Sequence, residues 1–303
     1  MAKPYPLRRR SDAENLRNLI ENSGKPRIPD FFGIGAEKCG TTWLWQMFRE
    51  HPDIGVPLPK ELRYFSHQYL GTSLINFTAL RQLLQDFDKA PKGPRQMENL
   101  ATELRMAFGT DESYLRVFGN LKGRRVGDIS PQYCMLPQAG ILHMQKIAPD
   151  AKIIFLIRDP VERVISAGKM KASEAQEEPT ETLVRKHAFV RFQLEMSRYS
   201  AILDRFEAAF PNRVFVGNMD DIGNRPLGFL EDLCAFLGVG YDPSYFPNVT
   251  RKANEGKKLS ISPQLRRDIY SSLKDEYIAL AHRFPEWAAT WKARHETELA
   301  QDD

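Results

Sequence analysis

A short apolar segment that runs into a glycine-bearing turn constrains this chain more than any other feature. Residues 31–35 read Phe-Phe-Gly-Ile-Gly, and the turn that follows carries Lys38 and Gly40 before two threonines and an aromatic-rich segment. A strand, a turn and a helix N-terminus in this order direct backbone N–H groups and an ammonium to one place, which suits a phosphate-like anion. The segment therefore predicts an anion-binding turn after a buried strand.

The turn has the glycine spacing of a nucleotide-binding P-loop, with one difference. Gly35 and Gly40 are separated by four residues, but Thr41 stands where a P-loop has its lysine, and the lysine lies inside the turn at Lys38. A Mg-nucleotide kinase depends on the lysine after the second glycine, so the sequence argues against ATP hydrolysis. The alternative interpretation is a tight strand-to-helix turn with an exposed lysine.

A second candidate anion site lies much later in the chain. The unbroken apolar run Ile153–Ile157 is typical of a strand buried on both faces, and Arg158 follows it directly, with Ser166 further on. A guanidinium can grip a phosphate with two hydrogen bonds, and a hydroxyl adds another. The alternative is that Arg158 forms an ion pair with Asp159 or Glu162.

In this order, the two segments resemble the donor-binding motifs of sulfotransferases, which use 3′-phosphoadenosine 5′-phosphosulfate (PAPS). Residues 37–43 read Glu-Lys-Cys-Gly-Thr-Thr-Trp and resemble the 5′-phosphosulfate loop, commonly Pro-Lys-Ser-Gly-Thr-Thr-Trp. Arg158 and Ser166 occupy the places of the 3′-phosphate block. The chain departs from the loop pattern at Glu37 and Cys39, and a thiol donates hydrogen bonds only weakly.

The resemblance implies a set of donor-binding residues, with adenosine 3′,5′-bisphosphate (PAP) as the product. They are Lys38, Cys39, Gly40, Thr41, Thr42, Trp43, Arg158, Ser166, Gly256 and Lys257. Gly256 and Lys257 belong to a basic segment, 251–258, which sits where the family folds a loop over the donor; a solvated basic loop is an equal alternative. For Trp43, packing of the helix is favoured over stacking on adenine, because aromatic side chains usually serve packing.

The resemblance also implies catalytic residues. Sulfuryl transfer resembles phosphoryl transfer, so Lys38 would neutralise the charge that builds on the bridging oxygen. Glu61 matches the glutamate that glycosaminoglycan-type relatives use as a base; Lys60 and Arg63 would lower its pKa, and burial would raise it. The alternatives are a salt-bridged Glu61 on a loop, and His67 as the base.

A further echo of the family lies at 127–133, which read Gly-Asp-Ile-Ser-Pro-Gln-Tyr. Relatives often read Glu-Lys-Ser-Pro-x-Tyr, so Asp128, Ser130 and Tyr133 match, while Ile129 replaces the lysine. The missing lysine weakens the assignment to polysaccharide sulfation. The alternative is a strand end capped by Ser-Pro.

The chain-wide pattern predicts an α/β fold, with a parallel β-sheet flanked by helices in a P-loop-like nucleotide-binding architecture. Strands are expected at 31–34, 54–56, 125–129, 153–157 and 214–216, and helices at 41–50, 137–148, 181–210, 226–237 and 263–282. Both anion segments follow strands, where ligands of such sheets bind. Residues 1–28 are expected to form a flexible or loosely docked arm before a single domain, 29–303, in which 71–110 is a candidate helical insertion that shapes the acceptor site.

The composition of the chain limits which binding partners and which cellular compartment are expected. The net charge of +4 suits a protein that handles a polyanionic nucleotide but does not indicate nucleic acid. Three scattered cysteines fit free thiols in a reducing compartment and show no metal-ligand spacing. Because the sequence shows no signal peptide and no long apolar run, we expect a cytoplasmic protein without membrane or metal partners.

The sequence thus predicts a metal-independent, PAPS-dependent sulfotransferase that acts on a hydroxyl or amine of a small-molecule or carbohydrate acceptor. The identity of the acceptor and the oligomeric state stay open. Two alternatives remain: a P-loop nucleotide kinase, which would require magnesium, and an inactive nucleotide-binding module, which would bind the bisphosphate and transfer nothing.

Overall fold

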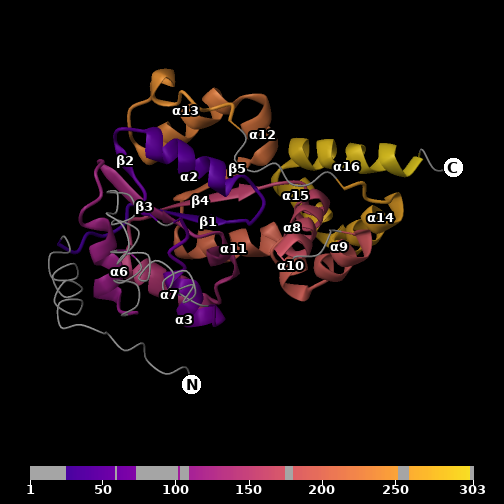
Figure 1. The fold of residues 1–303 in the computed structure, drawn as a ribbon, viewed down its shortest axis with the longest axis horizontal. Coiled ribbons are helices and arrows are strands. Elements are labelled where there is room, and N and C mark those ends of the chain that lie inside the picture. The colour runs from indigo at the N-terminus through magenta and orange to yellow at the C-terminus, as the bar shows by residue number, and fades with distance from the viewer. Residues whose placement is uncertain are drawn as a thin grey trace, which may run out of the picture.

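A five-stranded parallel sheet forms the centre of the molecule in the computed structural model, which describes residues 25–58, 60–72, 102, 109–174, 180–251 and 259–300 (Figure 1). The strand order is β2-β3-β1-β4-β5, and every neighbouring pair is parallel. The strands are β1 (Phe31–Gly35), β2 (Ile54–Gly55), β3 (Arg125–Ile129), β4 (Lys152–Ile157) and β5 (Val214–Asn218). The predicted fold class and the predicted strand positions are therefore confirmed.

Helices cover both faces of the sheet and extend beyond its carboxyl edge (Figure 1). On one face lie α2 (Thr41–Glu50), α12 (Met219–Asn224) and α13 (Pro226–Leu237), and on the other α3 (Tyr64–Leu70), α6 (Asp111–Phe118), α7 (Gln138–Ile147) and α11 (Tyr199–Ala209). Beyond the carboxyl edge gather α8 (Pro160–Glu174), α9 (Glu181–Ala188), α10 (Arg191–Glu195), α14 (Pro263–Ser272), α15 (Lys274–Arg283) and α16 (Pro285–Ala300). Short 3-10 helices occupy Pro131–Met135 and Pro243–Tyr245.

The central strand shows why the apolar run forms this sheet. All five residues of β1 are buried, and successive side chains point to opposite faces. The ring of Phe31 packs edge-on against Phe48 of α2, with 5.2 Å between centroids, and the ring of Phe32 packs against Phe65 of α3 at 5.9 Å. Each buried phenylalanine contributes about 1.5–3 kcal/mol through burial. The strand thereby holds the two helical layers together.

The strand order places a topological switch point beside β1. The chain leaves β1 toward β2 on one side of the sheet and leaves β4 toward β5 on the other. Connections that diverge in this way open a crevice at the carboxyl ends of the two strands, where ligands of α/β sheets bind. The two segments singled out in the sequence follow these two strands.

Two segments that were each predicted as one continuous helix are divided into several helices in the structure. The stretch expected at 181–210 is three helices, α9 to α11, and the helix expected at 263–282 is divided into α14 and α15 at Leu273. The backbone is extended at Val190, between α9 and α10, and within α10 Gln193 accepts from the fully buried Arg163 with its main-chain carbonyl and its side-chain oxygen, at 2.7 and 2.8 Å. A buried guanidinium needs such acceptors, and helical periodicity in the sequence does not reveal this need.

The ends of the chain and the expected insertion lie partly outside the described residues. Arg27, within the segment expected to be an arm, is held to the body: its N–H donates to Leu115 O at 3.1 Å and its guanidinium to Gly123 O at 3.2 Å. Most of 71–110, and 1–24, lie outside the described residues. The sequence analysis did not predict α16. Among the helices that the structure describes, none is long and apolar enough to cross a membrane.

Candidate active site

The turn after β1 is shaped by Gly40, which precedes the first residue of α2. Gly40 has a φ of 90°, in the left-handed region, and an added Cβ would lie 2.8 Å from Ile222 Cδ1 of α12. Glycine is therefore favoured at this position by its left-handed conformation, whereas the contact with Ile222 could be relieved by a movement of that side chain. The turn is tied to the neighbouring strand because Ala36 N–H donates to Leu156 O of β4 at 2.8 Å.

Lys38 lies at the centre of this turn and has a left-handed backbone, with a φ of 71°. Such a conformation is costly for a non-glycine residue and often marks a functional site. The ammonium of Lys38 lies 3.7 Å from the sulfur of Met170, on α8. Ser166 lies one helical turn before Met170, so the two share a face of α8. The lysine of the first segment therefore reaches the helix that carries the serine of the second.

The first turn of α2 offers backbone donors. Among the residues that the structure describes, no side chain caps this helix, and the first N–H groups of any α-helix have no intrahelical acceptor. Thr41 is buried and Thr42 is half-buried. Thr41 Oγ1 accepts a hydrogen bond from Lys60 Nζ at 3.5 Å. An anion at this helix end would be favoured by both the N–H groups and the helix dipole.

Cys39 and Trp43, both expected to contact the donor, have side chains in the core. The Cys39 thiol is fully buried, 3.9 Å from the Tyr199 hydroxyl, and burial raises its pKa to about 11. Trp43 is 5% exposed, and its indole N–H donates to Val249 O at 2.9 Å. The packing interpretation of Trp43 agrees with this geometry. A thiol in this position packs the turn against the core and does not face a ligand.

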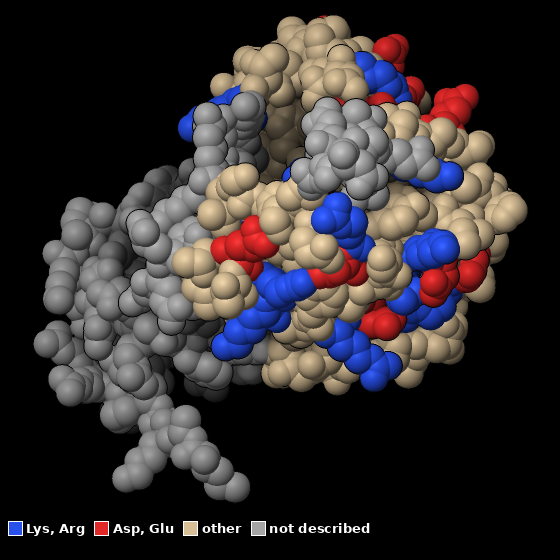
Figure 2. Space-filling model, turned by 90° about the vertical axis from the view of Figure 1, so that its right-hand side faces the viewer, with Lys and Arg blue, Asp and Glu red and all other residues tan. Residues whose placement is uncertain are grey.

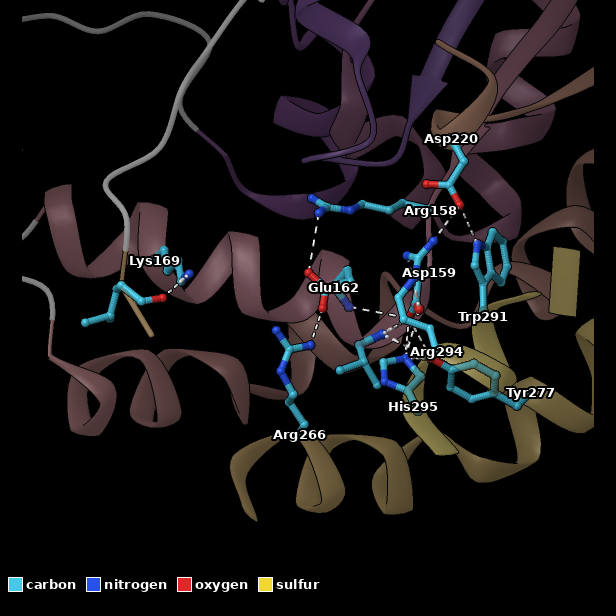
Figure 3. A network of polar contacts seen from close by, with 12 residues as sticks. Arg158, Asp159, Glu162, Lys169, Asp220, Arg266, Tyr277, Trp291, Arg294 and His295 are labelled. Carbon is cyan, nitrogen blue, oxygen red and sulfur yellow. Dashed lines mark hydrogen bonds and ion pairs between the residues drawn. The ribbon is translucent and has the colours of Figure 1, made fainter. Parts of the chain in front are cut away.

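The second segment also begins at the end of a strand. Arg158 follows β4, and its side chain is 24% exposed. Its Nη2 lies 3.5 Å from Glu162 Oε2, so one of the ion pairs considered in the sequence analysis is present (Figure 3). Asp159 is instead directed into the core and caps α8, accepting from Val161 N–H at 3.0 Å. Ser166, on α8, is half-buried.

The C-terminal helix α16 holds the start of α8 in place. The buried carboxylate of Asp159 contacts His295 Nε2 at 2.8 Å and accepts from the Tyr277 hydroxyl at 2.7 Å. Nearby, Asp220 accepts from the indole N–H of Trp291 at 3.0 Å (Figure 3). The sequence analysis missed this network, because none of its members has a spacing typical of a site. It fixes the backbone next to Arg158.

Two further cations surround the Arg158 segment. Lys169 of α8 donates to Leu259 O at 2.7 Å, and Arg266 of α14 donates to Glu162 (Figure 3). Burial lowers the pKa of Lys169, and Arg266 and Arg158 lower it further against the opposing influence of Glu162. The four side chains therefore share one electrostatic environment.

Glu61 lies on the other side of the first turn, in a segment with strained backbone. Its φ is 69°, and that of Arg63 is 57°. One carboxylate oxygen accepts from Lys60 at 2.7 Å, and the other accepts from Arg63 at 2.7 Å. Burial raises the pKa of Glu61, but Lys60 and Arg63 outweigh burial and lower it below its usual value. Glu61 is thus an ionised carboxylate held between two cations.

The buried carboxylate of Asp128 is linked to this segment through Ser130. Asp128, at the end of β3, accepts hydrogen bonds from Ser130 at 2.8 Å, Tyr133 at 2.6 Å and Tyr114 at 3.0 Å. Burial raises the pKa of Asp128 to about 6, although the three hydroxyl donors act against the rise. Ser130 Oγ also accepts from Arg63 N–H at 3.0 Å. The family-like segment 127–133 therefore holds the backbone next to Glu61 in place through the contact of Ser130 with Arg63.

The remaining candidates lie away from this arrangement or outside the described residues. His67 is exposed, with Nδ1 2.7 Å from Thr72 O. Ile129 is buried in the core. Gly256 and Lys257 fall in 252–258, outside the described residues. In the part of the chain that is described, no three His, Cys, Asp or Glu side chains are grouped as metal ligands would be.

The charges on the face that carries the C-terminal helices are mixed. Figure 2 shows Lys and Arg side chains interspersed with Asp and Glu there. Examples among the described residues are the ion pairs Arg185–Asp268 and Arg198–Asp275. A nucleic-acid interface typically gathers one sign of charge over a face, and this face does not.

Solved structures with the same fold are sulfotransferases. One from Alicyclobacillus acidocaldarius is 24% identical, with a TM-score of 0.59, over 87% of this chain and 98% of that one. The sulfotransferase domain of the Synechococcus PCC 7002 olefin synthase is 21% identical, with a TM-score of 0.53, over 86% and 96%. The mouse sulfotransferase SULT7A1, complexed with PAP, is 15% identical, with a TM-score of 0.50, over 93% and 94%.

At these identities the structures show the common fold alone. No curated protein matches the sequence significantly. The model of the sulfotransferase family matches residues 29–243, which is most of the chain and includes both anion segments. The resemblance inferred from the two segments is therefore confirmed, and this chain belongs to the sulfotransferase family.

Proposed function

We propose that this protein transfers a sulfuryl group from PAPS to a hydroxyl or amine of a small-molecule or carbohydrate acceptor. One observation carries the proposal: the Lys38 turn and the Arg158–Ser166 segment follow the adjacent strands β1 and β4 and meet where Lys38 contacts Met170 of α8. Two anion-binding segments at one switch point suit a nucleotide with a phosphate at each end. The neighbour complexed with PAP supports this choice of donor.

The residues of the two segments fit such a donor. The uncapped first turn of α2, with Thr41 and Thr42, would bind the 5′-phosphosulfate, and Arg158 with Ser166 would bind the 3′-phosphate. During transfer the bond between sulfur and the bridging oxygen breaks, and the acceptor atom bonds to sulfur. The bridging oxygen leaves on PAP with its negative charge, which Lys38 is positioned to stabilise.

The acceptor proton requires a base, and we assign Glu61. It is ionised at neutral pH because Lys60 and Arg63 lower its pKa, and it lies on the segment that contacts Thr41 of the donor turn through Lys60. A carboxylate held by two cations is a weak base, so we expect the acceptor to displace one of them when it binds. His67, which is exposed beside Thr72, is the second candidate.

The donor is tested by calorimetry with PAP, followed by transfer of labelled sulfate from PAPS to an acceptor panel. We expect one PAP per chain and transfer that survives a metal chelator. Transfer of phosphate from ATP that is lost with the chelator would instead identify a nucleotide kinase. Tight binding of PAP with no transfer to any acceptor would identify an inactive nucleotide-binding module.

A further inference from the structure

Glu162 lies between two arginines in the first turn of α8. Arg158 Nη2 approaches one carboxylate oxygen at 3.5 Å, and Arg266 of α14 donates to the other oxygen. Figure 3 shows the two guanidinium groups on opposite sides of the carboxylate. Arg266 is 104 residues away from Glu162 in the chain, so only the folded structure brings them together.

The two contacts of Glu162 differ in strength. The contact of Arg158, at 3.5 Å, is at the outer limit of a hydrogen bond, whereas Arg266 lies well within hydrogen-bond range of the other carboxylate oxygen. All three side chains are largely shielded, with exposed fractions of 24% for Arg158, 19% for Glu162 and 20% for Arg266. Water screens charges less in such surroundings. The negative charge of Glu162 is therefore neutralised mainly by Arg266.

This division matters because Glu162 and a bound phosphate would compete for Arg158. A carboxylate and a phosphate oxygen are recognised by the same guanidinium donors. If Arg266 were absent, Glu162 would be free to pair fully with Arg158 and to repel a phosphate beside it. Lys169 belongs to the same environment, since its pKa is lowered by burial and further by Arg266 and Arg158.

We propose that Arg266 is a positioning residue of the 3′-phosphate site, which holds Glu162 and so leaves Arg158 available to the phosphate. The inference rests on the proposed function, because it takes Arg158 to bind the 3′-phosphate. It gives α14 a role in donor recognition that no motif in the sequence indicates. Arg266 acts here through Glu162 and needs no contact with the nucleotide.

The test is a double-mutant cycle read by calorimetry with two nucleotides, PAP and adenosine 5′-monophosphate, which lacks the 3′-phosphate. The variants are Arg266→Gln, Glu162→Gln, the double variant and Arg266→Lys. The matched control is Arg267→Gln, because Arg267 is the next residue on α14 and donates to Gln264 of the same helix at 3.2 Å. Thermal melting of each variant reports its folding.

We expect Arg266→Gln to lower the affinity for PAP about tenfold, as the loss of one charge at this range implies. The affinity for adenosine 5′-monophosphate should be unchanged. Glu162→Gln in the same chain, or Arg266→Lys instead, should restore most of the affinity, and Arg267→Gln should have no effect. Glu162→Gln alone should bind PAP at least as tightly as the wild type. This variant keeps the inference testable if Arg266→Gln does not fold.

Three results would overturn the inference while the proposed function stands. They are wild-type affinity in Arg266→Gln, an equal loss for both nucleotides, and a loss that Glu162→Gln does not restore. The last result would mean that Arg266 binds the phosphate itself. Failure of the proposed function is distinct, because the wild-type protein would then not bind PAP.

Discussion

The two sides of the candidate site are built differently. On the proposed donor side, Lys38 and Arg158 follow adjacent parallel strands, and the main-chain bond from Ala36 to Leu156 joins the two strand ends. On the proposed acceptor side, Glu61 lies on an irregular segment held by side-chain contacts to Lys60, Arg63 and Ser130. Backbone ladders hold the donor side, and ion pairs hold the acceptor side.

This difference matches the demands on each side. A donor nucleotide presents the same phosphates in every turnover, so groups fixed by a sheet can be organised for them in advance. An acceptor pocket must admit a particular molecule, and loops with exchangeable ion pairs allow this. We therefore expect substitutions on the donor side to have larger and simpler effects than those on the acceptor side.

The largest expected effect is the loss of Lys38. Lys38→Ala should lower kcat about a thousandfold, because the ammonium would stabilise the charge that develops on the leaving oxygen. The measurement is the rate of labelled sulfate transfer at saturating PAPS. Lys122→Ala removes the same charge from an exposed position before β3 and should leave the rate unchanged. A Lys38→Ala enzyme with the wild-type rate would remove this residue from the reaction.

The acceptor side is tested by Glu61→Gln, which should lower kcat about a hundredfold if the carboxylate takes the acceptor proton. Its pKa is lowered by Lys60 and Arg63, which outweigh burial, so the base stays ionised and the wild-type rate should not fall as pH drops from 8 toward the usual glutamate range. Glu112→Gln on α6 is the control, since Glu112 pairs with Arg116 at 2.6 Å. Full turnover in Glu61→Gln would move the base elsewhere, with His67 tested next.

The support of the acceptor side is tested through Asp128. Its pKa in the folded protein is about 6, above the usual value of 3.8, because burial disfavours the charged form. The folded protein holds the proton of Asp128 more tightly than the unfolded chain does, so this group raises the free energy of unfolding at low pH relative to high pH. The contribution is fully present below pH 3.8 and is lost as pH rises through 6. The shift corresponds to about 3 kcal/mol, to order of magnitude.

Asp128→Asn should remove that part of the pH dependence, measured as the free energy of urea unfolding from pH 4 to pH 7. Glu276→Gln is the comparison variant, because burial also raises the pKa of Glu276, to about 7, and this carboxylate lies on α15, where it accepts from Ser200 of α11. It should change the unfolding curve at higher pH and leave sulfate transfer intact. An unchanged pH dependence in Asp128→Asn would contradict the burial argument.

A smaller effect is expected for Arg158→Ala, which should raise the Kd for PAP about thirtyfold through the loss of charge-assisted hydrogen bonds. The affinity for adenosine 5′-monophosphate should change little, because that ligand has no 3′-phosphate. Arg116→Ala removes a comparable arginine that pairs with Glu112 within one helix, and it should bind PAP normally. Calorimetry that gives the wild-type Kd in Arg158→Ala would break the assignment of the donor side.

Much of the donor side was predictable because its determinants are local. The run Ile153–Ile157 is apolar throughout, and a short run of this kind is typical of a parallel strand buried on both faces. Glycine at position 40 likewise indicates a turn, because glycine adopts the left-handed φ that the structure shows there without steric cost. The acceptor side was less predictable: the role of Glu61 as a base stays a prediction, and the structure shows the ion pairs that the sequence analysis gave as the alternative, with Lys60 and with Arg63 at once.

The sequence by itself determined the α/β class, the family and the place of the two candidate anion segments after β1 and β4, because these depend on short runs of residues whose chemistry is local. Only the tertiary structure decided that Cys39 faces the core, that α16 fixes Asp159, and that Arg266 reaches Glu162. These features join residues far apart in the chain. Their energies depend on burial and distance, which exist only once the chain has folded.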